Sequence, residues 1–231
     1  MNTRARPAFY ALRPGGWRDY VTLLHPPYTL WHLSYVALGA AFVPRMDWPL
    51  LGWTMLAFFL AMGVGAHALD ELQGRPLQTL IPARVLVALA AVSIGAACAI
   101  GCVIAAQRTL WLLVFVAAGG FIVVAYNLEL FGGALHGDVC FAAAWGAFPV
   151  LTAYFAAAHT LRSAAVAAAI YAFLTSWVQR TLSTPVRAVR RKPADEVTDA
   201  ERAIAPPAER ALQMLAFACV FLGAAALLAR A

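Results

Sequence analysis

The chain has 231 residues, of which 63% are hydrophobic and 12% are charged, and its mean hydropathy is +0.74. A soluble domain carries about twice this charged fraction, so the composition excludes an ordinary soluble domain and predicts an integral membrane protein. The net charge of +6 is spread over segments between apolar stretches, where it suits anionic lipid headgroups. We therefore expect the lipid bilayer as a partner and expect no nucleic acid.

Residues 1–24 precede the first apolar stretch and contain arginines, prolines and glycines. This composition predicts a basic, cytoplasmic N-terminal arm. Its aromatic residues Tyr10, Trp17 and Tyr20 are candidates for the belt of tyrosine and tryptophan that lies at membrane interfaces.

Residues 25–231 form one predicted domain with seven apolar stretches that are long enough to cross a bilayer as tilted helices. The pattern predicts an all-α, polytopic membrane bundle of about seven transmembrane helices, with a kink at Pro149. Six or eight spans stay open as alternatives, because the first and sixth stretches are short and rich in alanine. The stretches are Tyr28–Val43, Trp48–Ala68, Ala83–Ala106, Leu110–Tyr126, Val139–Ala158, Ser163–Val178 and Ala211–Leu228.

The distribution of basic residues predicts the orientation of these spans. With the N-terminus inside the cell, only four of the 17 basic residues fall in outer segments: Arg45, Arg108, Arg162 and Arg230. Basic residues favour the cytoplasmic side of a membrane. We therefore expect a multi-pass protein of the inner (cytoplasmic) membrane with its N-terminus inside, and a charged cytoplasmic loop at about 181–210.

A first group of ionisable residues follows the second apolar stretch. His67, Asp70, Glu71 and Arg75 lie at helical spacings that place them on roughly one face. Ionisable groups at the mouth of a membrane span are costly, so they suggest a functional site. Mg²⁺ usually takes one or two carboxylates together with phosphate oxygens, and an arginine can hold phosphate directly. The alternative is a polar helix end in which the acids face water and the arginine pairs with one of them.

A second acidic group, Asp195 and Asp199, has the four-residue spacing that places both carboxylates on one helical face. This pair is the candidate for a second metal position, and the alternative is an ordinary solvated helix with acids in its first turn. Basic residues that precede the pair are candidates for binding phosphate, and Asn127 is expected to face the same cavity. These basic residues are Arg187, Arg190, Arg191 and Lys192.

Several segments resemble the UbiA superfamily of intramembrane prenyltransferases. His25-Pro26-Pro27 resembles the family's Arg-Pro opening of the first helix, and Tyr126-Asn127 resembles the tyrosine that ends the fourth. The segment 67–82, with Thr79 and Pro82 in its tail, lies where the family has its first aspartate-rich motif, and residues 137–149 resemble the fifth helix.

The resemblance implies an all-α fold with a cytoplasm-facing cavity in which two acidic motifs hold Mg²⁺ and an isoprenoid diphosphate. It also implies transfer of the prenyl group to a lipophilic or aromatic acceptor. The chain departs from the family's first motif, because His67, Glu71 and Arg75 stand in place of asparagine, aspartate and aspartate. Asp195 also comes 15 positions after Arg180, where the second motif is expected to begin.

Two functions are compatible with this pattern. The first is a divergent prenyltransferase, or a related diphosphate lyase or cyclase, with His67, Asp70 and Glu71 as catalytic residues. In it the carboxylates would bind Mg²⁺, and the imidazole would orient a carboxylate or accept a proton. The second is a non-catalytic relative, a lipid-binding or scaffolding membrane protein that has lost full metal ligation.

Overall fold

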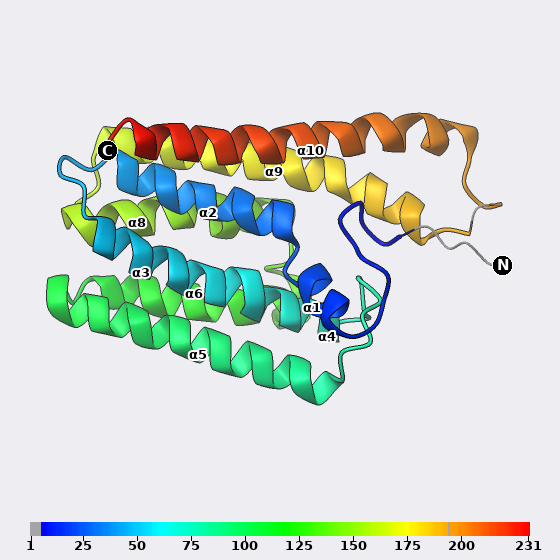
Figure 1. The fold of residues 1–231 in the computed structure, drawn as a ribbon, viewed down its shortest axis with the longest axis horizontal. Helices are drawn as coiled ribbons and strands as arrows, with labels where there is room; N and C mark the ends of the chain where they lie inside the picture. Colours follow the sequence, from blue (N-terminus) through cyan, green and yellow to red (C-terminus); the bar gives the residue numbers. More distant parts are fainter. Residues whose placement is uncertain (1–5, 194) are drawn as a thin grey trace.

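The structure, a computed structural model, describes residues 6–193 and 195–231, and within these ranges it contains helices and no strands. Figure 1 shows the long helices lying side by side along one axis, with the chain reversing direction at each connection. Short connections favour such antiparallel neighbours. The prediction of a helical bundle is confirmed.

The chain runs through one short helix and then through long helical segments, two of which contain a π-helical stretch. In order these are α1 (Trp17–Leu23), α2 (Pro26–Ala41), α3 (Trp48–Phe58), the π-helical η1 (Phe59–Ala66), α4 (His67–Leu72), α5 (Ala83–Arg108), α6 (Leu112–Asn127), the 3₁₀ turn η2 (Phe131–Gly133), α7 (Asp138–Phe141), the π-helical η3 (Ala142–Ala147), α8 (Phe148–Ala158), α9 (Ser163–Arg191) and α10 (Asp199–Leu228).

All seven predicted apolar stretches are helical, but fewer of them have the length and composition of a membrane span. Among the described residues, four continuous helices are long and apolar enough to cross a membrane: Trp48–Leu72, Ala83–Arg108, Asp138–Ala158 and Asp199–Leu228. Helices α2 and α6 have 16 residues each, fewer than the roughly 20 that a span needs, and α9 is charged in its second half. The structure therefore supports a membrane bundle but does not support a count of seven spans.

Three segments that contain basic residues meet at one end of the bundle, which we call the basic end. They are the described part of the N-terminal arm, the connection between α4 and α5, and the connection between α9 and α10, and the C-terminus lies at the opposite end (Figure 1). Such clustering is what the positive-inside pattern requires of a bundle. The orientation of this end toward the cytoplasm, and the inner membrane as the location, stay predictions.

The expected loop at 181–210 is mostly helical. Helix α9 continues to Arg191 and α10 begins at Asp199, so only a short connection separates them. Thr198 and Glu201 form a capping box, in which each side chain accepts a hydrogen bond from the backbone N–H of the other. This arrangement satisfies donors that the first turn leaves free, and it explains why α10 starts well before the apolar stretch at Ala211.

The backbone just before Pro149 departs from a regular α-helix, and the kink expected at this proline stays a prediction. Pro149 lies in the first turn of α8, directly after the π-helical η3. Because proline has no N–H, it cannot donate to the carbonyl of Trp145 four residues earlier. His32 Nδ1 lies 2.9 Å from that carbonyl oxygen and provides a partner for it.

Glycines allow the helices at the centre of the bundle to approach closely. A Cβ atom at Gly39 of α2 would overlap the backbone oxygen of Val150 of α8, and one at Gly146 of η3 would overlap the backbone oxygen of Ala172 of α9. Small residues have this role in many membrane bundles, where backbone contact replaces the hydrophobic driving force. The close approach of α2 to α8 and of η3 to α9 therefore depends on glycine at positions 39 and 146, because any side chain there would overlap the neighbouring backbone.

Gly39→Ala should destabilise the bundle, because the added methyl group has to push α2 away from α8. Overpacking of this kind costs about 1–3 kcal/mol, which corresponds to a fall of roughly 2–12 °C in melting temperature for a protein of this size. Thermal unfolding of the purified protein in detergent measures it. Gly95→Ala is the matched control, because a Cβ there meets nothing within 4 Å. Equal melting temperatures for the two variants would contradict this account of the packing.

Candidate functional site

A cavity of about 470 Å³ lies at the basic end, enclosed by the N-terminal arm, the α4–α5 connection, the α6–α7 connection and the second half of α9. We call it the polar cavity, because charged groups and imidazoles line much of its wall. Its charged lining residues are Asp70, Glu129, Arg180, Arg187, Arg190, Arg191 and Glu209. Its histidines are His25, His32, His67 and His136.

The structure brings together about half of the residues that the sequence singles out. Those that line the polar cavity are His67, Asp70, Asn127, Arg187, Arg190 and Arg191. Those that are not among its lining residues are Glu71, Arg75, Lys192, Asp195 and Asp199. The residues outside the cavity lining either pair with other parts of the chain or face solvent.

Glu71 is fully buried and faces the α4–α5 connection, away from the cavity. Its two carboxylate oxygens accept hydrogen bonds from the N–H groups of Leu77 and Thr79, both at 2.9 Å, and from the Thr79 hydroxyl at 2.8 Å. Three donors occupy the oxygens that a metal would need. The geometry therefore makes Glu71 an anchor of the connection and does not support its predicted role as a catalytic residue and metal ligand.

Arg75 and Asp19 complete the set of contacts that fix this connection. Arg75 has a left-handed backbone conformation (φ 54°), and its guanidinium donates to the carbonyl oxygen of Ile81 at 2.6 Å. The carboxylate of Asp19, a buried residue of α1, accepts from the N–H of Leu80 at 2.9 Å. Arg75 therefore stabilises backbone carbonyls, and the structure does not place it where it was predicted to hold phosphate.

The predicted second metal position does not form. Asp195 and Asp199 are exposed at the connection between α9 and α10, and Asp199 begins α10, where an acid is favoured by the helix dipole. Lys192, predicted to hold diphosphate, instead pairs with Glu201 at 2.6 Å. Within residues 6–193 and 195–231, no group of three or more histidine, cysteine or acidic side chains is arranged to hold a metal ion. The donor set therefore does not fit the predicted Mg²⁺ site.

The arginines of the polar cavity differ in how fully they are paired. Arg190 donates to both carboxylate oxygens of Glu209, at 2.5 and 2.6 Å, and Arg180 donates to Asp138 at 3.0 Å. The Arg187 side chain is solvent-exposed and lines the cavity, and it makes no hydrogen bond or ion pair with any residue that the structure describes. The site therefore holds a guanidinium that is not hydrogen-bonded to a carboxylate.

The surroundings of Arg187 disfavour its charge. The protein atoms around it and the neighbouring Arg180 lower the pKa of Arg187 from its ordinary value, while the carboxylate of Asp70 opposes this shift. Asp70 also lines the cavity, and its carboxylate makes no hydrogen bond or ion pair with the described residues. An added anion would relieve the electrostatic cost at Arg187.

Three of the histidines hold one defined tautomer. In each, Nδ1 lies within hydrogen-bond distance of a backbone carbonyl oxygen, which can only accept, so Nδ1 carries the proton and Nε2 is left free as an acceptor. The pairs are His32 with Trp145 at 2.9 Å, His67 with Gly63 at 3.1 Å, and His136 with Tyr126 at 3.0 Å. The fourth, His25, stacks on His67 with ring centroids 4.0 Å apart.

Buried polar atoms without partners are concentrated in this cavity. His25 Nε2, Tyr126 Oη and Gln179 Oε1 are the three buried side-chain atoms of the described chain that lack a hydrogen-bond partner, and all three residues line the polar cavity. Buried polar groups in proteins are nearly always paired. Each of these atoms is covered in the structure, so a ligand or an ordered water can pair with it only where the surrounding side chains move.

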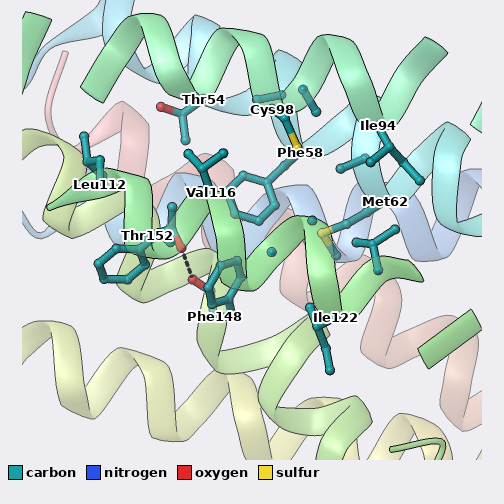
Figure 2. Close-up of a pocket in the computed structure, with 18 of the residues that line it drawn as sticks. Thr54, Phe58, Met62, Ile94, Cys98, Leu112, Val116, Ile122, Phe148 and Thr152 are labelled. Atoms are coloured by element: carbon teal, nitrogen blue, oxygen red, sulfur yellow. Dashed lines mark hydrogen bonds between the residues drawn. The ribbon is translucent and has the colours of Figure 1, made fainter. Parts of the chain in front are cut away.

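A second, apolar pocket of about 110 Å³ lies between α3–η1, α5, α6 and η3–α8. Figure 2 shows Phe58, Met62 and Phe148 among the side chains that surround it. The hydroxyls of Thr54 and Thr152 donate to carbonyl groups of their own helices, both at 2.8 Å, so the wall offers no unpaired polar group from these residues. We call it the apolar pocket.

Trp145 separates the two spaces, because it lines both the polar cavity and the apolar pocket. Its ring stacks on Phe141, with centroids 5.6 Å apart and planes 5° from parallel, and lies 4.5 Å from the ring of Tyr126. These rings form an aromatic boundary between a cationic space and an apolar one. The arrangement suits an amphiphilic ligand with an anionic head.

Comparisons of the chain with protein-family models, with curated proteins and with solved structures found no match. The resemblance to the UbiA superfamily therefore rests on the sequence motifs alone.

Several lining residues were not predicted from the sequence. Gln179 and Arg180 belong to α9, and a regular spacing of three or four residues relates Gln179 to Ser183, Arg187 and Arg190 along one helical face. This periodicity was readable once α9 was extended past Val178. Tyr10, which was expected at the membrane interface, also lines the cavity.

Glu71→Ala should destabilise the protein, because it leaves two backbone N–H groups and one hydroxyl buried without an acceptor. Each unsatisfied group costs about 1–3 kcal/mol, so the melting temperature should fall by at least about 6 °C. Thermal unfolding in detergent with excess chelator measures this. Asp195→Ala is the control, because its side chain is exposed. If Glu71→Ala melts like the wild type without metal, the anchoring role is refuted and the metal-ligand role is restored.

Proposed function

We propose that this protein binds a phosphorylated isoprenoid or a related phosphorylated lipid at the basic end of the bundle. The anionic head would occupy the polar cavity, the hydrocarbon chain would enter the apolar pocket, and arginines would take the place of Mg²⁺. The observation that carries the proposal is the unpaired Arg187 in a cavity with unpartnered polar atoms.

The choice of a phosphate head follows from the charge and shape of the donors. Arg187 and Arg191 are one turn apart on α9 and both line the cavity. Guanidinium groups bind phosphate through two parallel hydrogen bonds and keep their charge at all physiological pH values.

The choice of a hydrocarbon chain follows from the apolar pocket, which shares the Trp145 side chain with the wall of the polar cavity. The pocket extends along α8 to Ala156, 11 residues beyond Trp145. At about 1.5 Å per residue this distance is roughly 16 Å, or about half of a hydrocarbon core that is roughly 30 Å thick. A chain of that length would reach the middle of the bilayer.

Binding, the second function compatible with the sequence, is favoured here over prenyl transfer. Of the carboxylates assigned to metal ligation, only Asp70 lines the polar cavity. Transfer of an allylic group to a lipophilic or aromatic acceptor stays a prediction, and the observation in its favour is the aromatic boundary of Tyr126, Phe141 and Trp145. Rings of this kind stabilise a nearby cation.

Arg187→Gln should weaken binding of farnesyl diphosphate by at least about tenfold, because hydrogen bonds to charged groups contribute about 1.5–3 kcal/mol. Titration of the purified protein in detergent, with chelator present, measures the dissociation constant. The wild type should bind equally well with and without Mg²⁺. Arg84→Gln is the control, since Arg84 is exposed and does not line the cavity. Loss of wild-type binding on chelation would contradict the proposal.

Ala144→Phe should obstruct the apolar pocket, which Ala144 lines. We expect this variant to bind farnesyl diphosphate at least about tenfold more weakly, because burial of each methylene contributes about 0.8 kcal/mol, and to bind inorganic diphosphate like the wild type. Ala143→Phe, at an exposed neighbouring position outside the pocket, should leave both affinities unchanged. Equal effects of the two variants on the affinity for farnesyl diphosphate would show that the hydrocarbon chain of the ligand binds outside the apolar pocket.

A further inference from the structure

The described part of the N-terminal arm forms one wall of the polar cavity. Residues 7–10 line the cavity beside α9 and the start of α2, and Figure 1 shows the arm curving over the basic end next to α1 and α4. A segment outside the helical bundle thus covers a space that the bundle itself leaves open.

Three sets of contacts hold the arm in this position, one of which is the hydrogen bond from the Leu12 N–H to the Thr22 hydroxyl of α1 at 3.0 Å. At its tip the Tyr10 hydroxyl lies 2.8 Å from His25 Nδ1, and the rings of Phe9 and Tyr10 pack edge-on against Tyr28. Nearer the N-terminus, the Arg190 guanidinium donates to the backbone oxygen of Arg6 at 2.7 Å. The latter two sets reach helices α2 and α9, and they are separate from those that fix α1.

The tip contact joins two neutral groups. Burial raises the pKa of Tyr10 well above its ordinary value, and burial together with the neighbouring His67 lowers the pKa of His25 well below its ordinary value. At neutral pH the phenol keeps its proton and the imidazole is uncharged. A hydrogen bond between neutral groups favours the closed contact by only about two- to tenfold, so this contact alone holds the arm weakly.

The attachment of the arm to α1 allows the arm to open while α1 stays in place. Gly15 and Gly16 both have positive φ, of 116° and 64°, and no atom lies within 4 Å of a Cβ built on either. Glycine adopts these conformations freely. On the other side of the pair, Asp19 of α1 accepts from the N–H of Leu80 through Oδ2 and so fixes the helix to the α4–α5 connection. Its Oδ1 accepts from the N–H of Gly15 at 2.9 Å, a hydrogen bond that opening at Gly15 breaks.

We propose that residues 6–12 are a lid that opens about Gly15 and Gly16 to admit the head of the ligand and closes through the contact of Tyr10 with His25. Closure would cover His25, whose Nε2 has no hydrogen-bond partner among the described residues. The lid controls the rates of entry and exit, while the arginines of α9 set the affinity. The effect on ligand kinetics rests on the proposed function, whereas the opening of the arm does not.

Hydrogen exchange of the ligand-free protein tests the opening. Tyr10→Phe removes the hydroxyl and keeps the ring, so the Ala11 and Leu12 amides, which donate to Ala8 and to the Thr22 hydroxyl, should exchange about three to ten times faster. Tyr20→Phe is the matched control, because Tyr20 is an exposed tyrosine of α1. Phe9→Ala, which removes a ring contact instead, should act in the same direction. Unchanged exchange in both arm variants would overturn the lid.

Stopped-flow binding of farnesyl diphosphate tests the consequence. A gate acts on both directions, so Tyr10→Phe should raise the association and dissociation rate constants together, each by about three- to tenfold. Faster exchange with unchanged binding rates would overturn the gating role. Faster exchange in a protein that binds no phosphorylated lipid would support the lid and would count only against the proposed ligand.

Discussion

The geometry of the basic end depends on one buried carboxylate. Glu71 accepts three hydrogen bonds from Leu77 and Thr79, and these bonds fold the α4–α5 connection back against the end of α4. Consecutive side chains on a helix point about 100° apart, so anchoring Glu71 in the connection turns Asp70 toward the cavity. Two adjacent acids therefore have different roles: one shapes the wall and the other faces the ligand space.

Much of the fold follows from local sequence, and the exceptions have identifiable causes. Apolar stretches locate all seven long helices, because burial in lipid or protein requires a continuous apolar surface. The start of α10 at Asp199 differs from the predicted loop. Thr198 and Glu201 carry the capping signal for this helix, but the acids and prolines nearby also favour a loop. The structure supports four of the seven predicted spans by length and composition, and short apolar helices such as α2 pack most of their residues inside the bundle.

The site was predictable where one helix determines it and not where distant segments meet. The shared face of Arg187 and Arg191 is a property of α9 alone. The partner of His32 is a carbonyl 113 residues away, and that of Tyr10 lies on another segment; no local pattern encodes either pairing. The helical spacing predicted for Glu71 and Arg75 is wrong, because α4 ends at Leu72 and Arg75 has a left-handed backbone conformation. Both side chains are used by the connection that follows, which is a tertiary effect.

A contrast within the basic end argues for a binding role. In the α4–α5 connection, the carboxylates of Asp19 and Glu71 and the guanidinium of Arg75 are all engaged by the backbone. A few residues away, the polar cavity contains an unpaired guanidinium and buried polar atoms without partners. Unsatisfied groups destabilise a fold, and natural proteins concentrate such departures at functional sites. Since the same end of the bundle satisfies one set of groups fully, the unsatisfied set is better explained by a ligand that completes it than by poor packing.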